Sequence, residues 1–194
     1  MFRAWMMIPI LTSCDADVPA GQPSEAISTI TLTFTPATGG APLVFEASDP
    51  ELTGDVVTDP IELSDAVNYD LEIRFFDDSA GEDLTPEIER EGAEHQVFIV
   101  GGAVLGPASA STSAVVTHAY ADFDAGGLPI GLENTIVTAA EGEGDFEVIL
   151  RHLPPEGGVA VKSAGLAELV ASGGLGAIAG QTDVRMIFPL TVVP

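Results

Sequence analysis

The stretch Ile27-Ser28-Thr29-Ile30-Thr31-Leu32-Thr33-Phe34-Thr35 carries the clearest pattern in the sequence. Its apolar residues Ile30, Leu32 and Phe34 alternate with threonines, so one face is apolar and the other polar. This period of two, in a run rich in threonine and isoleucine, predicts a strand with one buried face. The run Val67–Phe76 has the same alternation. Together they predict a β-sheet with one face on a core.

Further runs with strand character follow along the chain, separated by clusters of Gly, Pro, Asp and Asn. They are Leu43–Ala47, Glu94–Val100, Thr112–Ala121, Leu132–Thr138, Asp145–Leu153 and Val184–Val193. About eight such segments with frequent turns are typical of a β-sandwich. The sequence therefore predicts an all-β domain over residues 26–194, an immunoglobulin-like antiparallel β-sandwich.

Two segments interrupt the strand pattern. In Thr85–Gly92, a threonine suited to an N-cap precedes Pro86 and several acids, and a glycine ends the run. These are start and stop signals of a short helix. Ser163–Ser172 has spaced apolar residues and is followed by two glycines. We expect both to be helical insertions between strands.

Composition excludes several classes of protein. The 194 residues have 6 Lys and Arg against 30 Asp and Glu, a formal net charge of −24. Such a chain is repelled by phosphate backbones, which argues against a nucleic-acid binder. The hydrophobic fraction of 46% is that of a folded domain. The acids concentrate between Asp77 and Glu94. This segment is interpreted either as a solvated face or as a patch that attracts cations.

The N-terminus has the order of an export signal. Arg3 precedes the apolar stretch Ala4–Leu11, and small residues follow; this predicts a signal peptide over residues 1–13. Leu11-Thr12-Ser13-Cys14 resembles the lipobox of bacterial lipoprotein precursors. The resemblance implies cleavage before Cys14, lipidation of this only cysteine, and a protein anchored to a bacterial membrane on its periplasmic or cell-surface side. The alternative is a free cysteine near the end of an ordinary signal.

Residues 14–25 are predicted to be a lipidated tether. Asp15–Glu25 contains two prolines, a glycine and three acids, without an apolar period. Fully extended, about eleven residues span roughly 35–40 Å. The choice between inner and outer membrane stays open.

The three histidines are the first candidates for chemistry, because each lies near the end of a predicted strand. Neutral imidazole together with carboxylate suits zinc, copper or nickel. The candidate ligands are His95, His118 and His152, with Glu94, Asp122 and Asp124. Such a site requires three strands to converge at one end of the sandwich. In the alternative, each histidine has a separate structural role.

Asp122-Phe123-Asp124-Ala125-Gly126-Gly127 also begins like a calcium loop, in which alternate side-chain oxygens face a cation. The third ligand position is a glycine, and no acid closes the loop at the usual distance. A β-hairpin turn explains the same residues without an ion. Zinc or copper is therefore the preferred ion, and calcium is less favoured.

Enzymatic signatures are missing from the sequence. It contains no G-x-S-x-G elbow, no H-E-x-x-H helix, no phosphate loop and no dinucleotide fingerprint. We expect no catalytic residues, and a hydrolase is the third and weakest possibility.

One further resemblance covers most of the chain after the tether. It rests on Glu94–Phe98, His118–Asp124, Gly127–Gly131 and Leu150–Pro154. These runs resemble a group of small bacterial surface or periplasmic lipoproteins. The resemblance implies the location and the all-β fold, and no activity.

Two functions are therefore expected. The first is a lipid-anchored protein that binds or handles a transition metal. The second is an ion-free interaction module, tethered to an envelope partner such as a transporter, with an exposed apolar patch or a free strand edge.

Overall fold

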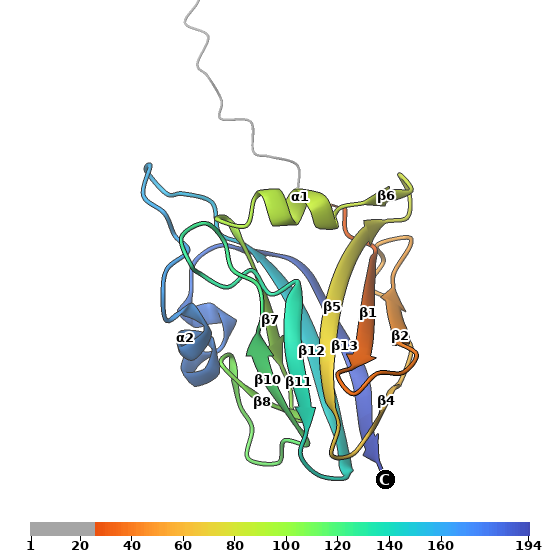
Figure 1. The fold of residues 1–194 in the computed structure, drawn as a ribbon. Helices are drawn as coiled ribbons and strands as arrows, with labels where there is room; N and C mark the ends of the chain where they lie inside the picture. The colour runs from red at the N-terminus through yellow and green to blue at the C-terminus, as the bar shows by residue number, and fades with distance from the viewer. Residues whose placement is uncertain (1–25) are drawn as a thin grey trace, which may run out of the picture.

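Two β-sheets packed face to face form the body of the protein in the computed structural model, which describes residues 26–194 (Figure 1). The predicted signal peptide, the tether up to Glu25 and the candidate lipidation site Cys14 lie outside the described residues. The prediction of an all-β sandwich is confirmed.

The larger sheet has the strand order β3-β2-β1-β5-β11-β10-β8-β9, with β6 paired to β5. Its strands are β1 (Thr29–Pro36), β2 (Leu43–Ser48), β3 (Val57–Thr58), β5 (Asn68–Asp77), β6 (Glu82–Asp83), β8 (Val104–Gly106), β9 (Ser109–Ala110), β10 (Val116–Tyr120) and β11 (Glu133–Thr138). The smaller sheet has the order β4-β13-β12-β7. Its strands are β4 (Ile61–Ser64), β7 (His95–Val100), β12 (Gly142–His152) and β13 (Gln181–Val193).

The core lies between the two sheets and follows from the alternation in the sequence. Ile30, Leu32 and Phe34 of β1 are fully buried, because period-two side chains point to the same face of a strand. The ring of Phe34 packs edge-on against Phe146 of β12, with 6.1 Å between centroids. This contact joins the two sheets.

Most neighbouring strands are antiparallel, as predicted, but two pairs are parallel. β8 runs parallel to β10, and β4 runs parallel to β13. β3, β4, β6, β8 and β9 are short and were not among the predicted strands. Runs of two to four residues are too short to show a period of two.

Both predicted helices are present. α1 spans Thr85–Arg90 and α2 spans Leu166–Gly173, followed by the 3₁₀ turn η1 at Leu175–Ala177. Thr85 is the first helical residue and not the N-cap. Its hydroxyl instead accepts a hydrogen bond from the Phe75 amide, at 2.9 Å, so it fixes α1 to β5.

The described chain enters at the end of the sandwich where α1 lies (Figure 1). The Ser28 amide donates to the carbonyl of Phe76, and Phe76 pairs with Asp83 of β6, just before α1. Within residues 26–194, no helix has the length and apolar character required to cross a membrane.

Candidate functional site

The structure brings two of the three histidines together. His95 of β7 and His152 of β12 are register partners. Their rings stack with centroids 4.8 Å apart and planes inclined by 11°. His95 is 2% exposed, and its Nδ1 donates to the carbonyl of Glu91 at 3.3 Å. Adjacent antiparallel strands thus place both side chains at one end of the smaller sheet.

Two carboxylates lie near this pair at distances longer than hydrogen bonds. His95 Nε2 is 3.9 Å from Asp183 Oδ2, and His152 Nε2 is 3.8 Å from Glu94 Oε2. Burial, with the neighbouring His152, lowers the pKa of His95. Burial also raises the pKa of Asp183, against the effects of His152 and Arg151. Both pKa shifts favour the uncharged forms of His95 and Asp183, because burial at this end of the smaller sheet penalises a charge on either side chain.

His118 occupies a different environment, on β10 of the larger sheet. Its Nε2 hydrogen-bonds Asn134 Oδ1 at 2.8 Å, and its ring packs edge-on against Tyr120. Burial lowers the pKa of His118, and the bond to Asn134 opposes this only partly. A Cβ on Gly106 would lie 3.0 Å from the His118 ring. His118 is therefore enclosed by its own sheet.

The predicted metal ligands are thus divided among separate environments. Among residues 26–194, no group of three or more His, Cys, Asp or Glu side chains is arranged to hold a metal ion. His95 and His152 share one end of the smaller sheet with Glu94, whereas His118 is bound to Asn134.

The two aspartates of the predicted calcium loop are used by the backbone of that loop. Asp122 accepts hydrogen bonds from the amides of Gly131 and Leu132, at 2.7 and 3.0 Å. Gly131 has a φ of +91°, which a residue with a Cβ rarely adopts. Both carboxylate oxygens of Asp122 are thereby occupied. This is the geometry of a hairpin turn.

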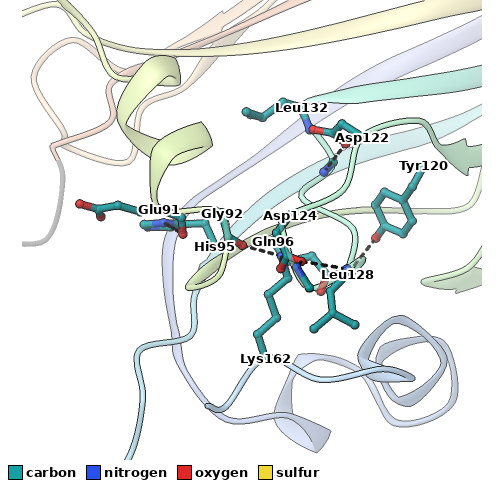
Figure 2. Close-up of polar contacts among 12 residues, drawn as sticks. Glu91, Gly92, His95, Gln96, Tyr120, Asp122, Asp124, Leu128, Leu132 and Lys162 are labelled. Atoms are coloured by element: carbon teal, nitrogen blue, oxygen red, sulfur yellow. Dashed lines mark hydrogen bonds and ion pairs between the residues drawn. The ribbon is translucent and has the colours of Figure 1, made fainter. Parts of the chain in front are cut away.

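Asp124 joins three segments of the chain (Figure 2). Its Oδ1 accepts from the amides of Gly126 and Leu128, and its Oδ2 lies 3.0 Å from Lys162 Nζ. Lys162 also donates to the carbonyl of Gly92, at 2.6 Å. Burial opposes ionisation of Asp124, but the hydrogen bonds from Leu128 and Lys162 outweigh it and lower its pKa. The side chains of Lys162 and Asp124 are 1% and 6% exposed, so this is a buried ion pair.

An open acidic cavity of about 350 Å³ lies between α1, β5, β6, β11 and the loop that carries Phe123. We call it the acidic cavity. Its lining includes Glu72, Asp83, Glu89, Phe123, Ile130 and Glu133. Phe123 is 56% exposed. Phe123 thus presents a large apolar side chain to solvent beside several carboxylates.

The carboxylates that line the acidic cavity outnumber the positively charged side chains that pair with them. Glu72 and Glu133 are direct register partners on β5 and β11, and like charges directly opposite destabilise a sheet. Arg74 pairs with Glu72 and Asp83, at 2.8 and 3.4 Å. Within the described part of the chain, neither Glu89 nor Glu133 forms an ion pair. The cavity therefore has acids in excess of its one arginine.

Positive charge elsewhere in the described chain is already engaged. Each Lys and Arg side chain between residues 26 and 194 has an oxygen partner: these are Arg74, Arg90, Arg151, Lys162 and Arg185. Among residues 26–194, no lysine or arginine is therefore left without a partner to pair with Glu89 or Glu133.

Sequence reasoning indicated the acidic segment Asp77–Glu94, which contains Glu89, as a candidate cation-attracting patch. It missed Phe123 and Glu133 as site residues, because packing of separate segments brings them to that segment. The available signal was Phe123 itself, an aromatic residue between two aspartates in a predicted turn. It also missed Lys162, the only lysine of the chain.

Comparison with known proteins gives no relative from which a site could be transferred. No protein-family model matches the chain, and no curated protein and no solved structure matches it significantly.

Proposed function

We propose that the protein is a lipid-anchored, extracytoplasmic binding module without an ion. In this proposal it captures a positively charged segment of a partner protein in the acidic cavity beside α1. The observation that carries the proposal is the half-exposed Phe123 ring in a cavity whose carboxylates exceed its cations. Carboxylates attract ammonium and guanidinium groups, and an aromatic face adds a cation–π contact.

The lipid anchor is proposed at Cys14, from the lipobox in the sequence. Because the described chain enters at the α1 end, a tether of about eleven residues would place the acidic cavity toward the membrane that holds the anchor. A partner embedded in that membrane, such as a transporter, would lie within reach. Anionic lipid headgroups themselves would be repelled by the carboxylates.

The geometry favours this function over a transition-metal site. The acidic cavity is open and has unpaired charge, whereas His118 is enclosed with Asn134, away from the stacked pair. Asp122 and Asp124 are occupied by backbone amides.

The direct test is titration of the purified protein with a synthetic hexapeptide of alternating arginine and serine, at low and at moderate salt. We expect binding that weakens with salt, since the attraction is electrostatic. The double variant Glu89→Gln/Glu133→Gln should weaken binding about tenfold, or ~1.4 kcal/mol.

The matched control is Glu62→Gln combined with Glu143→Gln, because both are exposed acids on strands of the smaller sheet, β4 and β12. It removes the same two charges away from the acidic cavity. The proposal fails if the peptide does not bind, or if the control weakens binding as much as the double variant does.

A further inference from the structure

A second cavity, of about 480 Å³, is also lined by Phe123. We call it the apolar cavity. Small and aliphatic residues form most of its wall: Gly92, Ala93, Ala125, Leu128, Ile130 and Ala160. It shares Glu89, Phe123 and Ile130 with the acidic cavity. The two cavities are therefore neighbours, and Phe123 belongs to the wall of each.

Most charged groups that line the apolar cavity have an ion partner. Lys162 and Asp124 form the buried pair described above, and Arg90 pairs at 2.8 Å with Glu87, which lies outside the lining. Glu89, which lines both cavities, is the one acid of this lining without an ion pair among the described residues. Apart from this shared residue, the apolar cavity offers apolar or charge-balanced walls, whereas the acidic cavity offers free carboxylates.

The loop fixes the backbone that carries Phe123. The backbone of Phe123 forms an isolated β-bridge with Pro129, and the Asp124 amide donates to the carbonyl of Leu128 at 2.8 Å. The turn bonds of Asp122 and Asp124 fix the flanking backbone. A side chain on such a backbone, lining two neighbouring cavities, can separate two side chains of one ligand.

We propose that the partner segment is extended and bears a basic side chain next to an apolar one, so that it straddles Phe123. The basic group enters the acidic cavity and the apolar group enters the apolar cavity. In an extended segment, residues i and i+2 point to the same side about 7 Å apart, a spacing that fits across one ring. This inference rests on the proposed function. It adds a second requirement for the partner segment, an apolar side chain near the basic one. Charge complementarity selects a basic segment over a second copy of this acidic chain.

The test compares two synthetic peptides with the purified protein by calorimetry. The first is acetyl-Gly-Arg-Ser-Leu-Ser-Arg-Gly-amide, and the second has serine in place of its leucine. We expect the leucine peptide to bind about tenfold more tightly. Ala160→Phe, at an exposed wall position of the apolar cavity, should bring the ratio close to one while leaving binding of the serine peptide unchanged.

Ala93→Phe fills the apolar cavity from another wall position and is the second variant, in case the first does not fold. Ala119→Phe, at an exposed site on β10, is the matched control and should keep the tenfold ratio. Equal binding of the two peptides to the unmodified protein overturns the inference and leaves the proposed function standing. Failure of both peptides to bind overturns both.

Discussion

The buried histidines and the acidic cavity use polar residues in opposite ways. His95 and His118, in their two separate environments, are each 2% exposed, with pKa values lowered by burial. Phe123 is 56% exposed, and Glu89 and Glu133, which line the same cavity, are exposed acids. The histidines are enclosed in surroundings that favour their neutral form, whereas the cavity is open and charged.

This difference teaches that residue type is a weaker guide to a site than environment. A histidine suits metal binding only when its nitrogen atoms are accessible and converge with other ligands. Here, ordinary glutamates and one phenylalanine form the accessible surface. Residues that conflict with local rules, such as the facing Glu72 and Glu133, are where function is expected.

The largest expected effect is on the buried ion pair of Lys162 with Asp124. Lys162→Met should lower the free energy of unfolding by about 3–5 kcal/mol, because it leaves the buried Asp124 carboxylate without its ion partner. Urea denaturation measures this change. Arg90→Met breaks an exposed pair and should cause no measurable change. A loss below about 1 kcal/mol for Lys162→Met would show that the pair does not hold this end together.

Phe123→Ala should weaken binding of the basic peptide and leave the stability of the fold nearly unchanged. The ring is more than half exposed, so we expect the free energy of unfolding to stay within about 0.5 kcal/mol of the unmodified protein. Binding of the arginine–serine peptide should weaken about fivefold through loss of the cation–π contact. Fluorescence titration and denaturation of the same sample test both parts. Unchanged binding would remove Phe123 from the proposed site.

The stability of the protein should depend on pH through the buried His118. The pKa of folded His118 is lowered from its ordinary value of 6.5, so the unfolded chain binds a proton that the folded chain does not. The free energy of unfolding should then fall as pH decreases from 7.5 to 5.5, by at most about 1.4 kcal/mol per pH unit from one group.

His118→Gln keeps a donor for Asn134 and removes this titration, so the variant should lose less stability over the same range. Asp183 has a raised pKa and acts in the opposite direction, but it is present in both proteins and cancels in the difference. Denaturation at several pH values measures the effect. Parallel pH curves for the two proteins would contradict it.

The smallest expected effect is a gain in stability. Glu133→Gln removes the repulsion with Glu72 and should stabilise the protein by a few tenths of a kcal/mol. The same change should weaken binding of the basic peptide. Thermal denaturation with and without peptide tests both. A loss of stability would show that Glu133 is already balanced in the free protein.

Metal binding offers a separate check. In native mass spectrometry after chelation, with zinc, copper and calcium supplied in turn, we expect no stoichiometric ion, because no suitable group of ligands exists among residues 26–194. A bound ion that disappears in His95→Ala and His152→Ala would instead favour the metal function.

Much of the fold could be predicted because its signals are local. The alternation of Ile30, Leu32 and Phe34 specifies a buried face, and Pro86 with the following acids specifies the start of a helix. Strands of two residues, such as β3 and β6, form because the longer strands β2 and β5 offer an edge. No local pattern could identify them.

The site could be predicted only in part. The position of His95 and His152 near strand ends followed from the sequence, but their stacking depends on the register of β7 with β12. The acidic cavity depends on packing between α1, β5 and the loop that carries Phe123. Such long-range contacts are set by the whole sandwich, and no sequence spacing encodes them.

The most direct test of the central claim is an NMR titration of the isotope-labelled protein with the alternating arginine–serine peptide. The account predicts that the amide signals of Glu89, Phe123 and Glu133 shift first and saturate together, while those of β2 and β3 stay unchanged. Shifts confined to β2 and β3, or shifts at every acidic residue without saturation, would contradict a specific site in the acidic cavity.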